Sequence, residues 1–262
     1  MKTFVIVGCG RLAGVVAGAV IKGLLPEYDL IGVYSRTAAK AERIAGQMRN
    51  AGRACAVCES VEKLLALKPD ILVETASPAA LREWAVPTLK NGTSIVTLSI
   101  GALADDAFYR EVSAVAKENG TRIYIASGAT GGFDVLRTAA LMGGASARFF
   151  NEKGPDALKG TPVYTDSLQT EQKIVFSGNA AEAIRLFPTK VNVTVAASRA
   201  SVGPEAMHVT IQSTPGFKGD TQRVEIENEQ VRAVVDVYSA TAEIAGWSVV
   251  NTLLNIVSPV VF

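Results

Sequence analysis

The sequence predicts an α/β fold in which a doubly wound parallel sheet is followed by a second, α+β domain built on a mainly antiparallel sheet. Apolar strand-like runs alternate with helix-like segments over residues 1–126, which is typical of a parallel sheet covered by helices. From about residue 145 the strand-like runs alternate in polarity, which favours antiparallel strands with one solvated face. We therefore expect domains at 1–126 and 127–237, with a C-terminal helix in 238–262 that packs back onto the first domain.

Composition excludes several classes of protein. The 262 residues are 48% hydrophobic and 19% charged, which indicates a globular rather than a disordered chain. A net charge of +1 gives no basic field for nucleic acid or an acidic membrane. The sequence shows neither a secretion signal nor an apolar run of membrane-spanning length, so we expect a cytoplasmic protein.

The three cysteines fit a reducing compartment. Cys55 and Cys58 form a C-x-x-C pair, which leaves a redox or metal role open. No second pair completes a zinc site, so we favour structural thiols and expect no metal.

The first strand, expected at residues 3–7, ends in a G-x-G-x-x-A turn. Gly8 permits the tight turn, Gly10 lets the backbone approach a pyrophosphate, and Ala13 lets the next helix pack on the strand. Because the turn follows a strand and opens a helix, it predicts a Rossmann domain that binds a dinucleotide. The predicted contact residues here are Gly8, Gly10, Arg11, Leu12 and Ala13.

The second strand, expected at residues 29–34, ends in Ser35, Arg36 and Thr37. In this fold an acidic residue at that end binds the ribose 2′-hydroxyl of NAD, whereas an arginine accommodates the 2′-phosphate of NADP. No acidic residue occurs between Tyr34 and Ala41, so we predict a preference for NADP. The alternative is that Arg36 stacks on the adenine and NAD also binds.

The rest of the first domain continues the alternation. Further strands are expected at 53–57, 70–74, 94–98 and 122–126, with helices at 38–50, from Ser60, from Pro78 and up to about Asn119. Thr75, Ala76 and Ser77 follow the fourth strand at its carboxyl end, where ligands bind in open α/β sheets. Ala76 and Ser77 are therefore candidate cofactor contacts near the nicotinamide ribose, the alternative being a helix cap.

The second domain opens with the glycine-rich segment Ser127–Asp134, whose backbone can come close to a ligand. Helices are expected at 135–142 and 180–186, and strands at 146–150, 173–176, 191–195, 207–212, 223–227 and 231–237. The last helix has an apolar stripe at helical spacing through Ile244, Trp247, Val250, Leu254 and Val257.

Four segments resemble the L-aspartate dehydrogenase family, in the same order along the chain. They are S-G-A-T-G-G-F-D from Ser127, S-I-G-A-L-A-D from Ser99, F-P-T-K-V-N-V from Phe187 and E-T-A-S-P from Glu74. The resemblance implies an enzyme of two or more identical subunits that interconverts L-aspartate and iminoaspartate or oxaloacetate with a nicotinamide cofactor, in support of NAD biosynthesis. It also implies cofactor contacts at Ala129 and Asn192.

The chain departs from the family pattern at two places. Gln222 stands where the resemblance places the catalytic histidine, and the N-P-K-T-S segment is missing. Glutamine can hydrogen-bond a substrate but does not exchange protons near neutral pH. Other titratable groups near the matched segments are Lys190, Lys218, Asp220 and the sole histidine, His208, which sits in an expected strand.

The sequence therefore predicts an NAD(P)-dependent amino-acid dehydrogenase of the aspartate type, with Gln222 and Lys190 as candidate catalytic residues. Two alternatives stay open: an NADP-dependent enzyme for a different amino or oxo acid, and a non-catalytic NADP-binding homologue.

Overall fold

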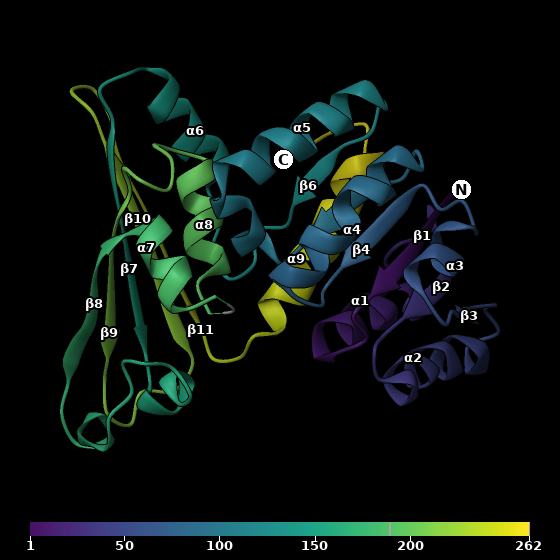
Figure 1. The fold of residues 1–262 in the computed structure, drawn as a ribbon, viewed down its shortest axis with the longest axis horizontal. Coiled ribbons are helices and arrows are strands. Elements are labelled where there is room, and N and C mark those ends of the chain that lie inside the picture. The colour runs from purple at the N-terminus through teal and green to yellow at the C-terminus, as the bar shows by residue number, and fades with distance from the viewer. Residues whose placement is uncertain (189, 262) are drawn as a thin grey trace. The chain divides into compact units, whose positions relative to one another are not determined.

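The computed structural model describes residues 1–188 and 190–261, which form two compact units (Figure 1). The first unit comprises Met1–Ala126 and the C-terminal segment from Ala245, and the second comprises Ser127–Ile244. Each unit has its own sheet and its own hydrophobic core.

The first unit contains a six-stranded sheet in the order β3-β2-β1-β4-β5-β6, and every described pairing in it is parallel. Its strands are β1 (Lys2–Val7), β2 (Tyr28–Tyr34), β3 (Ala56–Val57), β4 (Ile71–Glu74), β5 (Ser94–Thr97) and β6 (Ile123–Ile125). This is the Rossmann order, in which the chain reverses direction across the sheet between β1 and β4 and leaves a crevice at their carboxyl ends. The predicted fold class is confirmed. The third strand is shorter than predicted, because as an edge strand it pairs only with Gly32 and Val33 of β2 among the described residues.

Helices cover both faces of this sheet (Figure 1). They are α1 (Arg11–Ile21), α2 (Ala38–Asn50), α3 (Val61–Leu65), α4 (Pro78–Lys90), α5 (Asp106–Glu118) and α9 (Glu243–Val257), with a 3-10 turn η1 (Ile100–Ala104) after β5. Phe4 and Ile6 of β1 pack against α1, α2 and α9, whereas Val5 and Val7 pack against α3 and Trp84 of α4. This alternation along one strand places a core on each side of the sheet.

The C-terminal helix α9 belongs to the first unit, but two details of its prediction are wrong. It begins at Glu243, because Tyr238 and Ser239 still pair with their neighbouring strand. Its buried face runs through Val249, Val250 and Leu253, while Trp247 is 40% exposed. The Tyr28 hydroxyl donates to the Leu253 carbonyl at 2.9 Å and fixes the helix to β2.

The second unit contains a five-stranded sheet in the order β11-β10-β7-β9-β8. Its strands are β7 (Ser146–Lys153), β8 (Lys173–Asn179), β9 (His208–Ser213), β10 (Asp220–Glu227) and β11 (Arg232–Ser239). Only the β7–β9 pairing is parallel among the described strands, so the sheet is mainly antiparallel, as predicted. One face is covered by α6 (Phe133–Leu141), α7 (Ala180–Leu186) and α8 (Asn192–Arg199), as Figure 1 shows, and 3-10 turns lie at Pro155–Leu158 and Asp166–Gln169.

The strand predicted at residues 191–195 is wrong, because the structure forms helix α8 there. A short apolar run does not distinguish a strand from a buried helix by its pattern alone. Residues 194–198 are all buried, and the small side chains of Ala196, Ala197 and Ser198 allow a helix to pack closely on the sheet.

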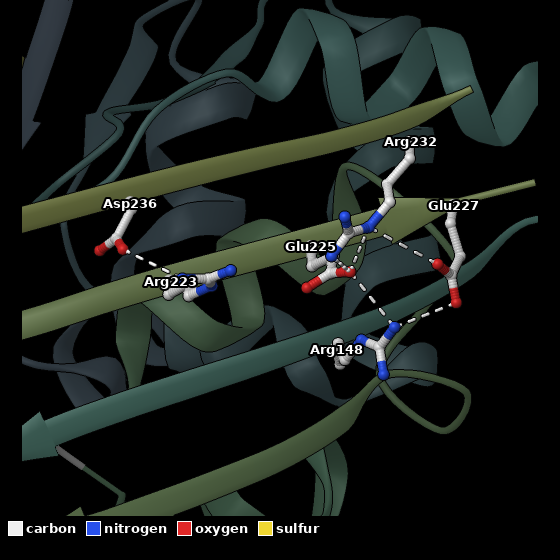
Figure 2. A network of polar contacts seen from close by, with 6 residues as sticks. All are labelled: Arg148, Arg223, Glu225, Glu227, Arg232 and Asp236. Atoms are coloured by element: carbon white, nitrogen blue, oxygen red, sulfur yellow. Dashed lines mark hydrogen bonds and ion pairs between the residues drawn. The ribbon is translucent and has the colours of Figure 1, made fainter.

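The opposite face of the five-stranded sheet carries a network of charged side chains (Figure 2). Glu225 of β10 is only 8% exposed and lies between Arg148 of β7 and Arg232 of β11, at 3.2 and 2.7 Å. Glu227 contacts the same two arginines. The hydrogen bond from Arg232 and the charge of both arginines hold the pKa of Glu225 below its ordinary value of 4.5.

Glu225→Gln is expected to lower stability at neutral pH, and the difference from the wild-type protein should shrink as the pH falls below about 4.5. The sign follows from the lowered pKa: the stabilising charge is fully present above the pKa of the unfolded chain and is lost as the pH falls through the pKa of the folded one. Urea unfolding between pH 7 and 3 measures this difference. In an Arg232→Met background the same substitution should show a weaker pH dependence, and an unchanged dependence would contradict the assignment to this pair.

Candidate functional site

A cavity of about 190 Å³ lies at the carboxyl ends of β1, β2 and β4. Seven residues predicted to bind the cofactor line it together: Gly8, Gly10, Ser35, Arg36, Thr37, Ala76 and Ser77. Its wall also includes Val7, Cys9, Tyr34, Lys40, Thr75, Ala80 and Trp84. The structure thus brings segments that lie far apart in the sequence to one hollow of the first unit.

The glycine turn after β1 is held close to the turn after β4. Gly8 has φ +91°, a left-handed conformation, and a Cβ atom there would lie 2.6 Å from the backbone of Ala76. The Thr75 amide donates to Val7 at 2.9 Å and its hydroxyl donates to the Gly8 carbonyl at 2.6 Å. Gly10 has no heavy atom within 4 Å of its Cβ position, so the space above it is open to a ligand.

The remaining three residues of the predicted motif have different positions. Arg11, Leu12 and Ala13 form the first turn of α1 and are not among the described residues that line the cavity. Ala13 is fully buried in the core beside β1, in keeping with the small residue that helix packing requires. Contacts from Arg11 and Leu12 to the cofactor stay predictions.

Positive charge gathers at the end of the cavity next to β2. Arg36 and Lys40 are exposed side chains in its wall, and no acidic residue is found among the described residues that line it. The Arg43 guanidinium donates to the carbonyls of Cys9 and Gly10 at 3.3 and 3.4 Å and supports the glycine turn from behind. Sequence reasoning missed Lys40 and Arg43, which one turn of α2 brings toward the motif.

Glu74, the last residue of β4, is a buried carboxylate that links the turns after β4 and β5. It accepts hydrogen bonds from the amides of Ala76, Ser77 and Ser99 at 2.7, 3.0 and 3.3 Å, and from the hydroxyls of Thr97 and Ser99 at 2.6 and 2.9 Å. Burial raises the pKa of Glu74, and these hydrogen bonds oppose that shift. Sequence reasoning missed this role, although a carboxylate ending an apolar strand was the available signal.

Ser77 also has the second role that its sequence left open. Its hydroxyl accepts from the Ala80 amide at 3.2 Å and caps α4, which has Pro78 at its first position. Because the cap residue itself lines the cavity, the capping role and the proposed cofactor contact do not exclude one another.

The cysteines are poor nucleophiles in this structure. Burial raises the pKa of Cys9 to about 11 and that of Cys55 to about 12, and it also raises the pKa of Cys58. A thiol with a raised pKa carries little thiolate at neutral pH, so the structural interpretation of the C-x-x-C pair is favoured. In the described part of the chain, no three histidine, cysteine, aspartate or glutamate residues lie close enough to hold a metal ion.

In the second unit, the glycine-rich loop at 127–132 lies against the start of α8. Gly128 has φ +67°, and a Cβ atom on it would approach Val193 to 3.2 Å, next to Asn192. Gly132, at φ +67°, would meet Val235 of β11 at 2.5 Å. The loop that carries Ala129 and the helix end that carries Asn192 are therefore neighbours within this unit.

Gln222 lies in β10 on the helix-covered face of the sheet and is 6% exposed. In the strand register it faces Asn151 of β7, whose side-chain amide donates to the Thr221 carbonyl at 2.9 Å. Two residues along the register, Asp220 faces Lys153, and their side chains form an ion pair at 3.3 Å. Sequence reasoning missed Asn151 and Lys153, because only the strand pairing places them beside Gln222.

The other candidate titratable residues have different positions. Lys190 is exposed and donates to the Ala157 carbonyl. His208 contacts the Ser177 hydroxyl at 3.3 Å and faces Arg148 in the register, on the sheet face opposite Gln222. The structure therefore does not bring His208 together with Gln222.

Two family models together match nearly the whole chain. The model for the NAD-binding domain of homoserine dehydrogenase matches residues 8–126, and that for the C-terminal domain of aspartate dehydrogenase matches residues 134–256. The L-aspartate dehydrogenase of Methanocella arvoryzae is 31% identical over 97% of this chain and 96% of its own length. The chain belongs to the L-aspartate dehydrogenase family. The resemblance predicted from four short segments is thereby confirmed.

Other proteins of this family and fold are similar over comparable lengths. The L-aspartate dehydrogenase of Methanosarcina mazei is 29% identical over 97% of each chain. The crystal structure of aspartate dehydrogenase from Thermotoga maritima has a TM-score of 0.79 at 24% identity, over 100% of this chain and 99% of its own. That of amine dehydrogenase from Mycobacterium smegmatis has a TM-score of 0.60 at 17% identity, over 98% and 92%.

This member of the L-aspartate dehydrogenase family is an oxidoreductase that uses a nicotinamide cofactor and a small-molecule substrate. Among the described residues, no helix has both the length and the apolar character needed to cross a membrane.

Proposed function

We propose that this protein is an NADP-dependent dehydrogenase that interconverts L-aspartate and iminoaspartate, or oxaloacetate and ammonia. The observation that carries the proposal is the 31% identity to an L-aspartate dehydrogenase over nearly the full length of both chains. The cavity at the glycine turn supports the cofactor part, since it offers a glycine-lined hollow at the place where this fold binds dinucleotides.

Within this proposal each unit has its own task. Gly8 and Gly10 let the pyrophosphate approach the start of α1. The 2′-phosphate of the adenosine ribose is bound by Ser35, Arg36 and Thr37. Ala76 and Ser77 lie along the cofactor toward its nicotinamide. The second unit contributes Ala129 and Asn192 as further cofactor contacts and Gln222 as a substrate contact. The reduced nicotinamide supplies the hydride, and the protein supplies orientation and charge.

The test is a steady-state assay of the purified protein with NADPH, ammonia and a panel of 2-oxo acids. Turnover of oxaloacetate with the highest kcat/KM supports the proposal. A higher kcat/KM with another acid supports the alternative enzyme, and tight NADPH binding without turnover of any acid supports the non-catalytic homologue. Both alternatives arise because Gln222, which does not exchange protons near neutral pH, occupies the position of the family histidine.

Arg36→Ala is expected to raise the KM for NADPH about 10- to 100-fold while changing the KM for NADH by less than about threefold. The reason is the loss of a charge-assisted hydrogen bond to the 2′-phosphate, which contributes about 1.5–3 kcal/mol. The matched control is Arg49→Ala, which removes an exposed arginine that pairs with Glu42 in the last turn of α2, the helix that follows Arg36. Equal losses with both cofactors, or a better kcat/KM with NADH in the wild-type protein, would contradict the NADP preference.

We further propose a cytoplasmic homodimer. The face of the five-stranded sheet that carries the Glu225 network also exposes Ile174, Val234 and Tyr238, which are 57%, 41% and 58% exposed. Light scattering after size-exclusion chromatography measures the mass in solution, and a mass of one chain at micromolar concentration would contradict a dimer.

A further inference from the structure

A buried polar row lies at one end of the helix-covered face of the five-stranded sheet. Lys153, the last residue of β7, has a side chain that is only 6% exposed. The strand register places Asp220 of β10 on one side of it and Ser213 of β9 on the other. The Asp220 side chain is 39% exposed, so the ion pair between Lys153 and Asp220 reaches solvent through the carboxylate.

This row is not fully paired within the described protein. The Ser213 hydroxyl is buried and has no hydrogen-bond partner there, and Asp220 Oδ1 is buried and makes only the ion pair to Lys153. Buried polar atoms are almost always hydrogen-bonded, and an exception calls for an explanation, a catalytic role being one of them.

The charge of Lys153 is held in an unfavourable environment. Burial lowers its pKa, the positive charge of Lys190 acts in the same direction, and Asp220 opposes both. These two groups, one on β10 and one before α8, are the described charges that act on Lys153. A lysine in such a setting gives up and regains a proton more readily than an exposed one.

Lys153 is also a diagonal neighbour of Gln222. Asp220 pairs with Lys153 and Gln222 pairs with Asn151, so Lys153 and Gln222 project from adjacent strands on the same face, two residues apart in register. Side chains in this relation are within reach of one another when one of them is long. The Gln222 amide, which does not exchange protons near neutral pH, thus lies beside an amine, which can.

We propose that Lys153 is the proton-exchanging residue of the substrate site and that Asp220 holds its ammonium in place. This inference rests on the proposed function. In the direction of amination, ammonia adds to the carbonyl carbon of the oxo acid and forms a carbinolamine. Lys153 Nζ donates a proton to its hydroxyl group, the carbon–oxygen bond breaks, and water leaves as the nitrogen lone pair forms the iminium. Neutral Lys153 then regains a proton from solvent on the side of Asp220. In the reverse direction it accepts the proton from the attacking water.

Lys153→Arg and Lys153→Met separate proton exchange from charge. Because arginine keeps the charge but does not release a proton, both variants are expected to lose at least about 100-fold in kcat, with the substrate KM changed by less than about threefold. The limb of the wild-type pH profile of kcat/KM that reports Lys153 should disappear in Lys153→Arg. Lys173→Arg and Lys173→Met, on an exposed lysine in the edge strand β8 of the same register row, are the matched controls and should keep wild-type kcat.

A second substitution asks whether Lys153 takes the place of the absent histidine. Gln222→His in the Lys153→Met background is expected to restore kcat at least about 10-fold, because an imidazole at that position can donate the proton instead. NADPH binding by fluorescence should be the same in all variants and shows that they are folded. If Lys153→Met does not fold, nitrogen-15 NMR of lysine-labelled wild-type protein gives the answer, with a Lys153 pKa below the ordinary value of about 10.4 expected.

Three outcomes would overturn the inference. They are a Lys153→Arg variant with a kcat within about threefold of wild type, no gain from Gln222→His, and an ordinary pKa for Lys153. Failure of the proposed function looks different: the wild-type protein then binds NADPH but turns over no oxo acid, which overturns both proposals together.

Discussion

Gly8→Ala is expected to weaken NADPH binding at least about 10-fold and to destabilise the first unit by about 2–5 kcal/mol. Two effects add at this position. A side chain at φ +91° is strained, which costs about 1–2 kcal/mol, and the new Cβ atom would lie 2.6 Å from the backbone nitrogen and Cα of Ala76. Since Ala76 belongs to the turn that lines the same cavity, relief of the contact widens or tilts the wall of the cavity. Fluorescence titration with NADPH and thermal unfolding measure the two effects separately.

Gly23→Ala is the matched control. Gly23 has φ +74°, but no heavy atom lies within 4 Å of its Cβ position. It should therefore show the strain without the collision, with a small loss of stability and unchanged NADPH affinity. If Gly8→Ala bound NADPH as well as Gly23→Ala does, the close approach of the two turns would be irrelevant to the cofactor.

Glu74→Leu is expected to lower the stability of the protein by at least about 3 kcal/mol and its melting temperature by roughly 10 °C. Five donors point at the Glu74 carboxylate, three of them backbone amides, and leucine removes the acceptor of all but the Ser99 amide, which also donates to the Thr97 hydroxyl. Each such loss costs about 1–3 kcal/mol. Because Ala76 and Ser77 supply two of the amides, the KM for the cofactor should rise more than the KM for the substrate.

Glu74→Gln distinguishes the loss of hydrogen-bond acceptors from the loss of side-chain volume. It keeps the size and one acceptor oxygen but turns an NH₂ group toward donors, so its effects should be intermediate, with the cofactor KM raised and the fold retained. Glu83→Gln, an exposed carboxylate on α4, should change neither quantity. A Glu74→Leu protein with wild-type stability and cofactor KM would show that the turns after β4 and β5 hold their positions without this carboxylate.

Local sequence patterns were sufficient to predict features that depend on the conformation of a short stretch of backbone. The glycine turn after β1 could be assigned from Gly8, Gly10 and Ala13, because a tight turn followed by a helix allows few residue types. The errors came where a short apolar run fits two structures, as in α8, or where helical spacing had two apolar faces, as in α9. The pattern of α9 did not decide whether Trp247 or Val249 faces the core.

The sequence by itself determined the two-part fold, the dinucleotide turn, the cationic end of the second strand and the family of this protein, because each depends on residues that are close together in the chain. Only the tertiary structure decided which distant residues meet. It brings Ala76 close to Gly8, buries Glu74 between the turns after β4 and β5, and places Lys153 beside Gln222. Strand order and register bring such residues together, and they depend on how whole elements pack rather than on any short segment.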